Sequence, residues 1–149
     1  MKLININPPV YVYTALLIML LLHFLIPLVK FVYYPYTLSG ILAIVIGIIL
    51  NLTADSILKK YNATVKPMLE TDVLITTGVF RKTRNPMYLG FILILLGTAI
   101  LLGSIFPFVI TIFFAVLMHF VFVLFEEKKL EDEFGSKWLE YKNNVRRWI

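Results

Sequence analysis

Four long apolar runs, separated by shorter polar stretches, dominate the order of residues along the chain. Each run is almost free of charged side chains and has about the length of helix needed to cross roughly 30 Å of hydrocarbon. The runs cover residues 10–29, 37–58, 86–102 and 105–125. This pattern predicts an all-α integral membrane protein with about four transmembrane helices, forming a single domain over residues 1–149.

The last two runs are joined only by Gly103-Ser104, so their helices are expected to pack antiparallel as a helical hairpin. Pro86, whose fixed φ suits the first position of a helix, then lies at the same level as Glu126 at the end of the fourth run. Glycines seven residues apart indicate faces where helices approach closely. These glycine pairs are Gly40 with Gly47 and Gly90 with Gly97.

Basic residues are distributed very unevenly about the apolar runs. Of the 14 Lys and Arg residues, all except Lys2 and Lys30 lie in the loop 59–85 or in the tail 126–149. Since positive charge beside membrane spans favours the cytoplasmic side, we expect this loop, this tail and both termini to be cytoplasmic. The tail is expected to form one amphipathic helix on the membrane face. Its apolar stripe comprises Leu130, Phe134, Trp138 and Tyr141.

The composition agrees with a membrane protein, because 60% of the 149 residues are hydrophobic and the mean hydropathy is +0.86. The net charge of +5 is better explained by orientation and anionic headgroups than by nucleic acid, so no nucleic-acid partner is expected. A sequence without cysteine excludes disulfides, thiolate metal sites and a cysteine nucleophile, and no metal is expected. No small-residue cleavage site follows the first run, so an uncleaved first span is expected.

Two polar clusters are expected to meet at the cytoplasmic end of the hairpin. One contains Arg81, Arg84, Asn85 and Tyr88, and the other is the pair Glu126-Glu127. Free N–H groups at a helix start favour a carboxylate, the glutamates suit a cation, and an aromatic face such as that of Tyr88 suits a positively charged group. A zwitterion with a second cationic centre, such as S-adenosylmethionine, fits this combination. The residues alone leave open that both clusters only flank the spans and pair loosely.

Several motifs follow one another in the C-terminal half. They are 72–80 (DVLITTGVF), 84–90 (RNPMYLG), 126–130 (EEKKL), Phe134-Gly135, Tyr141 and 145–148 (VRRW). In this order they resemble the isoprenylcysteine carboxyl methyltransferase family, and also the wider group of small membrane methyltransferases that includes phospholipid N-methyltransferases. The first two apolar runs resemble this family only as apolar spans and carry none of these motifs.

The resemblance implies an S-adenosylmethionine-dependent membrane methyltransferase whose active site lies at the cytoplasmic face, closed by the loop and the tail. A lipophilic acceptor would arrive from the bilayer, and an isoprenoid, a phospholipid or a small thiol or carboxylate all remain open. The chain departs from the family pattern at Asn85, where histidine is usual. The residues that match cofactor-binding positions are Asp72, Val73, Leu74, Ile75, Phe80, Asn85, Pro86, Met87, Tyr88 and Glu126.

Candidate catalytic and acceptor-side residues lie close to these motifs. Glu127 is the candidate general base, needed only if the acceptor is protonated, and Arg84 is the second candidate catalytic residue. His119 lies seven residues before Glu126 on the same helix face and could line the acceptor tunnel, although a histidine that only packs helices is the more common case. Phe122 occupies a tunnel position where prenylcysteine enzymes of the family tend to carry arginine, so a different acceptor is expected.

Two other classes of function remain open at this point. A nicotinamide-dependent membrane reductase, related to the sterol reductases, would share part of this helical architecture. The chain is short for such an enzyme, and its basic residues are not grouped for a phosphorylated dinucleotide. A non-catalytic membrane adaptor would not require polar residues to be grouped at one face, whereas a pseudo-enzyme that retained the fold would have the same pattern.

Overall fold

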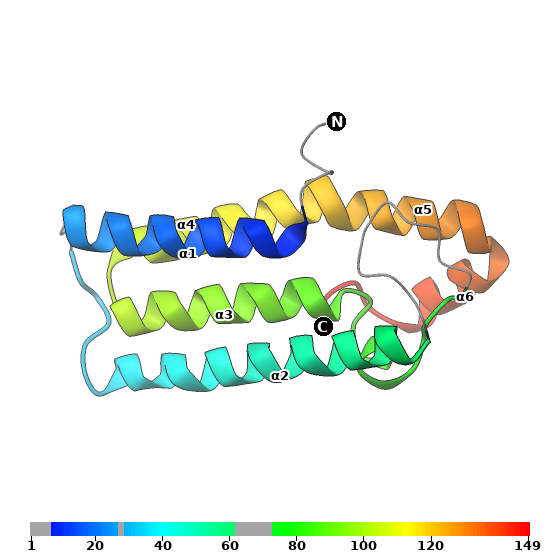
Figure 1. The fold of residues 1–149 in the computed structure, drawn as a ribbon, viewed down its shortest axis with the longest axis horizontal. Helices are drawn as coiled ribbons and strands as arrows, with labels where there is room; N and C mark the ends of the chain where they lie inside the picture. The colour runs from blue at the N-terminus through cyan, green and yellow to red at the C-terminus, as the bar shows by residue number, and fades with distance from the viewer. Residues whose placement is uncertain (1–6, 27–28, 62–72) are drawn as a thin grey trace.

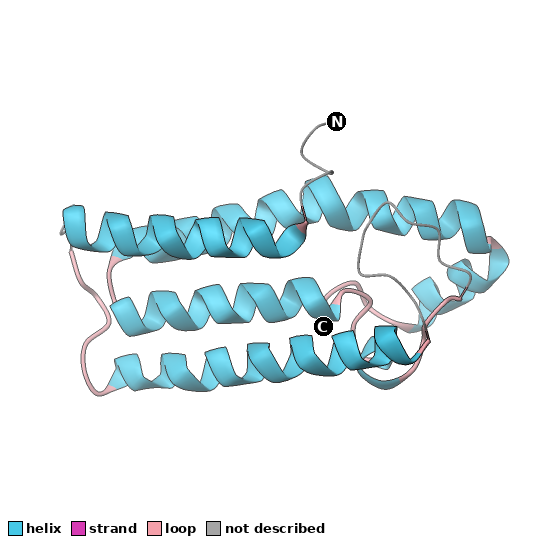
Figure 2. Cartoon of the chain, in the orientation of Figure 1, coloured by secondary structure: helices cyan, strands magenta, loops and turns pink. Residues whose placement is uncertain are grey.

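The computed structural model describes residues 7–26, 29–61 and 73–149, and within these ranges every regular element is helical (Figures 1 and 2). Asp72, which matches a cofactor-binding position, lies outside the described residues. The α-helices are α1 Pro8–Leu25, α2 Ser39–Lys60, α3 Pro86–Leu102, α4 Ile105–Met118, α5 Leu124–Phe134 and α6 Ser136–Asn144. Shorter helical segments are the 3₁₀ turns η2 Tyr36–Leu38 and η3 Gly78–Arg81 and the π-helical turn η4 His119–Val123.

Local sequence signals account for the ends of α3. The helix begins at Pro86, where the missing N–H costs nothing, and ends at Gly103, which adopts the left-handed conformation with φ of 70°. A glycine tolerates this conformation without the steric penalty of a Cβ atom. The helix therefore has the same bounds as the apolar run 86–102.

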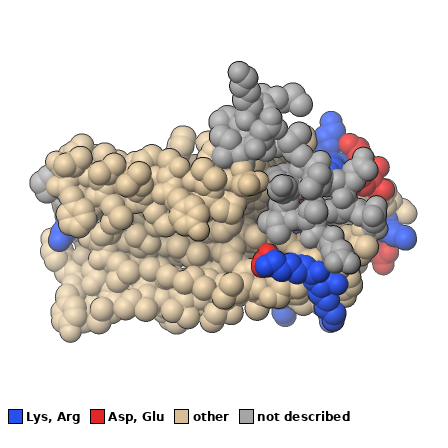
Figure 3. All heavy atoms as spheres, in the orientation of Figure 1, with Lys and Arg blue, Asp and Glu red and all other residues tan. Residues whose placement is uncertain are grey.

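The chain is a multi-pass membrane protein. Three continuous helical stretches are long and apolar enough to cross a bilayer, namely Pro8–Leu25, Tyr36–Lys60 and Ile105–Phe134, while Pro86–Leu102 is a shorter apolar helix of 17 residues. At 1.5 Å per residue, α3 extends about 25 Å, close to the thickness of the hydrocarbon core. The apolar body of the molecule is accordingly almost uncharged on the face shown in Figure 3.

The helices form a bundle in which α3 is central. It packs against α2 on one side and against α1 and α4 on the other, and α1 also packs against α4 (Figure 1). The buried core lies between α1, α3 and α4, where Met19, Leu95 and Met118 have no exposed surface. Beyond the start of α3, α5 projects from the bundle, and α6 folds back from its end (Figure 1).

Glycines allow α2 and α3 to approach at backbone contact. A Cβ atom on Gly47 would lie 2.6 Å from the carbonyl oxygen of Gly90, and one on Gly40 would overlap the carbonyl oxygen of Gly97. Such distances leave no room for any side chain. The two glycine faces predicted from the seven-residue spacing are therefore confirmed, and they face each other.

The opposite end of the bundle is joined by hydrogen bonds between the α1–α2 connection and the α3–α4 turn. The N–H of Phe31 donates to the carbonyl oxygen of Gly103 at 2.9 Å. His23 Nδ1 lies 2.6 Å from Ser104 Oγ, as a hydrogen bond between neighbouring helices. These contacts hold the hairpin of α3 and α4 against α1.

Two expectations about the C-terminal part were wrong. The fourth helix does not end at Phe125 but continues through η4 and α5 to Phe134, giving one stretch of 30 residues. Glutamate and lysine are good helix formers, so charge alone does not end a helix. The tail is also not one amphipathic helix, because Gly135, with φ of 50° and ψ of −118°, separates α5 from α6.

Candidate functional site

Charged side chains gather at the end of the molecule formed by α5, α6 and the start of α3 (Figure 3). Most of them lie on the surface, but three carboxylate and guanidinium groups of this end are largely enclosed. The side chains of Arg84 and Glu127 are 8% and 7% exposed, and that of Arg147 is 33% exposed. A charge that is removed from water must be paired or must bind a ligand, so this cluster is a candidate functional site.

The first pair in this region joins α3 to α5. Tyr88, buried on the first turn of α3, donates its hydroxyl hydrogen bond to Glu126 Oε1 at 2.6 Å. Glu126 lies in the first turn of α5, directly after the π-helical turn. The structure thus brings together the two polar clusters that the short Gly103-Ser104 connection predicts at one level.

The second pair is built on Glu127, which is buried although its neighbour is half-exposed. Arg147 Nε donates to Glu127 Oε1 at 3.0 Å and to Oε2 at 3.1 Å, and Arg147 Nη2 donates to Oε2 at 2.7 Å. These hydrogen bonds raise the pKa of Arg147 above its ordinary value. Arg84 Nη1 also approaches Glu127 Oε1 to 3.5 Å, so one buried carboxylate is paired with two guanidinium groups.

Arg84 is only partly satisfied by these contacts. Its guanidinium carbon lies 5.6 Å from the centre of the Trp138 ring, which is a cation–π contact. Its Nε and Nη1 atoms are buried and donate no hydrogen bond to any residue that the structure describes. A buried guanidinium with free donors is a site for an anionic group.

The chain between η3 and α3 is held by the C-terminal segment 145–148. The N–H of Arg84 donates to the carbonyl oxygen of Arg146 at 3.0 Å. The carbonyl oxygen of Arg147 accepts from Thr83 Oγ1 at 3.1 Å and from Asn85 Nδ2 at 3.1 Å. The side chain of Asn85 is therefore bound to the C-terminal segment.

An aromatic wall continues from the Tyr88–Glu126 pair into the apolar part of the bundle. Phe122 has no exposed surface, and its ring lies 6.2 Å from that of Tyr88 and 5.4 Å from that of Tyr11. His119 lies one turn earlier, 6.1 Å from the ring of Trp148. Both His119 and Phe122 belong to η4, and single π-helical turns of this kind are frequent at functional sites.

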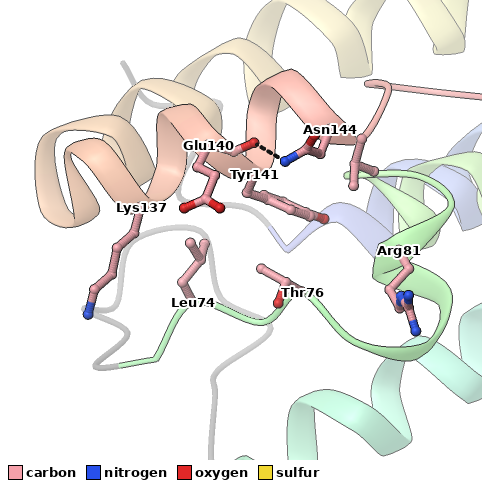
Figure 4. A pocket seen from close by; sticks show the side chains of 8 residues that line it. Leu74, Thr76, Arg81, Lys137, Glu140, Tyr141 and Asn144 are labelled. Carbon is pink, nitrogen blue, oxygen red and sulfur yellow. Dashed lines mark hydrogen bonds between the residues drawn. The ribbon is translucent and has the colours of Figure 1, made fainter.

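A cavity of about 540 Å³ lies between α6 and the chain that precedes η3 (Figure 4). Tyr141 lines the cavity, and its hydroxyl donates to the carbonyl oxygen of Phe80 at 2.6 Å. Burial raises the pKa of Tyr141 to about 12, so it remains a neutral donor. The cavity is lined by Leu74, Thr76, Arg81, Lys137, Glu140, Tyr141, Asn144 and Val145.

The residues expected to bind a cofactor therefore fall into two groups. Those around the start of α3 and α5 lie with the buried charges, whereas Leu74 lines the cavity and Phe80 is bound to α6. Val73 is exposed, Ile75 and Met87 are half-buried, and Pro86 is fully buried. Among the described residues, no group of three His, Asp or Glu side chains could hold a metal ion.

Sequence reasoning missed three contributors to this site. It did not identify the cation–π contact of Trp138 with Arg84 or the ion pair of Arg147 with Glu127. It also did not identify Thr83 as a hydrogen-bond donor to the C-terminal segment. No spacing rule connects residues so far apart in the chain. Arg146 and Arg147 carry the same charge at adjacent positions, so only the fold distinguishes them.

The fold and the site define a helical membrane protein with a polar, partly unpaired ionic site at one end of its bundle. Comparison with known families and proteins identifies the family to which the chain belongs. The chain belongs to the phospholipid methyltransferase family, whose model matches residues 35–137. The match includes α2, α3, α4 and α5 and therefore both Tyr88 and Glu126.

Curated relatives agree with this family. The chain is 34% identical over 142 residues to the protein-S-isoprenylcysteine O-methyltransferase of Saccharomyces cerevisiae, a match that covers 88% of this chain and 58% of the yeast protein. It is 34% identical over 76 residues to the enzyme of the same name from Schizosaccharomyces pombe, covering 49% of this chain and 31% of that protein. The chain thus spans little more than half the length of the first relative. The resemblance to isoprenylcysteine methyltransferases is confirmed.

A third relative is an uncharacterized protein of Haemophilus influenzae, which is 36% identical over 63 residues. This match covers 42% of the present chain and all of the Haemophilus protein. No solved structure matches the chain significantly.

Proposed function

We propose that this protein is an S-adenosylmethionine-dependent methyltransferase that acts at the membrane on a lipophilic acceptor. The observation that carries the proposal is the Tyr88–Glu126 hydrogen bond, which joins two family-matched helices at the polar end of the bundle. Family membership favours this function over a nicotinamide-dependent reductase and over a non-catalytic adaptor.

The side chains present fit the charges of such a cofactor. Arg84 is ion-paired with Glu127, but its buried Nε donates no hydrogen bond within the described residues and is available to a carboxylate. Glu126, held by Tyr88, offers a carboxylate to an ammonium group. The faces of Tyr88 and Phe122 suit a sulfonium, because aromatic rings attract cations. The bound cofactor supplies an electrophilic methyl group on sulfur.

In this proposal the protein aligns the methyl donor with the acceptor and excludes water from the site. Transfer of a methyl group from sulfur is an in-line displacement in which positive charge disperses, so the position of the acceptor determines the rate. In the proposal, Tyr88 and Glu126 hold the donor at the polar end, and Phe122 with His119 forms the apolar approach for the acceptor. Phe122 provides no charge to a substrate carboxylate, which favours an acceptor other than a prenylcysteine carboxylate.

The orientation in the membrane is part of the proposal. Both ends of the long connection between α2 and α3 lie at the same end of the bundle as α5 and α6 (Figure 1). This end carries most of the basic residues, which favours the cytoplasmic side. The active site and both termini are therefore assigned to the cytoplasm.

The test is a calorimetric titration of the detergent-purified protein with S-adenosylhomocysteine. The parent protein should bind, whereas Glu126→Ala and Tyr88→Ala should each bind at least tenfold more weakly, because hydrogen bonds to charged groups contribute about 1.5–3 kcal/mol. Tyr13→Ala, on the exposed apolar side of α1, is the control and should bind as the parent does. A parent protein that binds a reduced nicotinamide cofactor and not S-adenosylhomocysteine would contradict the proposal.

A further inference from the structure

The two adjacent arginines near the C-terminus make entirely different contacts. The side chain of Arg146 is exposed, and its hydrogen bond is a long one of 3.5 Å to the carbonyl oxygen of Ile149. The side chain of Arg147 turns inward and forms three hydrogen bonds with Glu127, the shortest at 2.7 Å. Attraction to lipid headgroups would act on both residues alike, so it does not explain this difference.

The contact between Arg147 and Glu127 depends on the shape of both groups. A guanidinium is planar and presents paired donors that match the two oxygens of a carboxylate, whereas a lysine ammonium is a single point charge. Glu127 is buried, so removal of its partner would leave a carboxylate without compensation. Its two oxygens are already engaged, which makes Glu127 better suited to anchor Arg147 than to accept a proton as a general base.

The same stretch of chain also binds the start of α3. The carbonyl oxygen of Arg147 accepts hydrogen bonds from Thr83 and Asn85, and the carbonyl oxygen of Arg146 accepts one from Arg84. The C-terminal segment 145–148 therefore connects α5, through Glu127, with the chain that leads into α3. These are the two helices that carry Glu126 and Tyr88.

We propose that Arg147 is a positioning residue for the donor site. By binding Glu127 with its side chain and accepting hydrogen bonds from Thr83 and Asn85 at its backbone carbonyl oxygen, it fixes the start of α3 against α5 and thereby holds Tyr88 and Glu126 in register. The role rests on the proposed function, because it assigns Arg147 an effect on donor affinity without direct contact to the donor. It also assigns Glu127 to positioning.

The closing experiment compares matched substitutions at the two arginines by titration with S-adenosylhomocysteine. Arg147→Gln should weaken binding at least tenfold, and Arg146→Gln, which removes the same charge one residue away, should change it less than twofold. Arg147→Lys keeps the charge but not the paired donors, so it should bind severalfold more weakly than Arg146→Lys. In a Glu127→Gln background, Arg147→Gln should weaken binding little further, because the two residues act as one unit.

A second readout follows the C-terminal segment without any ligand. The sequence contains only two tryptophans, Trp138 and Trp148, so protein labelled with 5-fluorotryptophan should give two ¹⁹F resonances, assigned with Trp148→Phe. Trp148 packs against the buried core beside His119. Its resonance should move and narrow in Arg147→Gln, as the segment is released, and should remain unchanged in Arg146→Gln.

The outcomes separate the positioning role from the proposed function. A parent protein that does not bind S-adenosylhomocysteine overturns the proposed function and the positioning role with it, whether or not the Trp148 resonance responds. A parent that binds, with Arg147→Gln or Arg147→Lys binding equally tightly, overturns the positioning role alone. A loss of thermal stability with unchanged affinity in the folded variant also overturns it, since this is what a merely structural ion pair would show. If Arg147→Gln does not fold, the comparison of Arg147→Lys with Arg146→Lys decides between these outcomes.

Discussion

Single hydrogen bonds to enclosed groups hold the polar end of this protein together. In surroundings of low dielectric constant, such bonds are strong, and the loss of one partner leaves the other without compensation. Tyr88 with Glu126 and Tyr141 with the carbonyl oxygen of Phe80 are of this kind. The first is proposed to act on the donor, whereas the second fastens α6 to η3 and serves stability.

Substitution of Tyr141 by phenylalanine tests the second bond. Tyr141→Phe keeps the ring and removes the donor to Phe80, so we expect a loss of about 1 kcal/mol in the free energy of unfolding. The check is thermal unfolding of the detergent-purified protein. The control is Tyr33→Phe, which should leave the midpoint unchanged, because the exposed hydroxyl of Tyr33 donates to the nearby carbonyl oxygen of Lys30.

The same bond predicts a dependence on pH. The pKa of Tyr141 is raised from 10.0 to about 12 in the folded protein, so the unfolded chain releases this proton first. The contribution of Tyr141 is therefore complete below pH 10 and is lost as the pH rises through 12. Unfolding measured from pH 8 upward should show parent and Tyr141→Phe converging at the alkaline end, and a difference that stays constant would contradict the assignment.

At the residue scale, the sequence predicts which residues belong to the site better than it predicts which of them contact each other. The approach of Tyr88 and Glu126 follows from the short turn that joins two helices, because the turn fixes both at one level. The choice of Arg147 over Arg146 does not follow, since it depends on the direction in which the chain leaves α6. The contact of Arg84 with Trp138 likewise depends on the path of the chain and does not follow from the sequence.

The packing of α2 against α3 depends on the absence of side chains. Gly40 lies against Gly97 and Gly47 lies against Gly90, so carbonyl oxygens of one helix stand where Cβ atoms of the other would lie. Close backbone contact of this kind increases van der Waals attraction between helices in a membrane. Since α3 carries Tyr88, this packing also fixes one side of the site.

Enlargement of one glycine tests this packing. Gly47→Ala would bring its Cβ to 2.6 Å from the carbonyl oxygen of Gly90 and 3.0 Å from the backbone nitrogen of Ile94, so the helices must separate. We expect a destabilisation of about 1–3 kcal/mol, which is the usual cost of overpacking. Thermal unfolding followed by circular dichroism provides the measurement.

The matched comparison for Gly47→Ala is Ile48→Ala, on the exposed apolar side of the same helix, which should have a much smaller effect. Equal midpoints for the parent and Gly47→Ala would mean that α2 and α3 are not in backbone contact.

The helix ends show where sequence reasoning succeeds and where it fails. Pro86 and Gly103 determine the ends of α3, because each has a backbone preference that few conformations satisfy. The fourth apolar run ends at Phe125, whereas the helix continues through Glu126 and Glu127 to Phe134. The sequence pattern did not predict the π-helical turn η4.

The whole molecule is polarised between an apolar body and a charged end. Figure 3 shows Lys, Arg, Asp and Glu concentrated where α5 and α6 lie. Helices α2 and α3 meet this end through the long connection between them, and η2 lies at the opposite end (Figure 1). This arrangement, together with the charge asymmetry, leads to the proposed cytoplasmic location of the site.

Single cysteines test the orientation, because the sequence has none of its own. Tyr36→Cys places an exposed thiol in η2, and Asn143→Cys places one on α6. In intact cells a membrane-impermeant maleimide should label Tyr36→Cys, and it should label Asn143→Cys only after permeabilisation. Labelling of Asn143→Cys in intact cells would place the site on the outer face.

The central claim, methyl transfer from S-adenosylmethionine to a lipophilic acceptor, is tested most directly by following the methyl group itself. Membranes that contain the protein are incubated with S-adenosylmethionine labelled in the methyl group, and the radioactivity in the organic phase is measured. Asp132→Asn, a charge change elsewhere on α5, serves as the control. We expect label in the organic phase with the parent and with Asp132→Asn, and at least a tenfold loss with Glu126→Gln. Equal labelling by the parent and Glu126→Gln, or no labelling above membranes that lack the protein, would contradict the account.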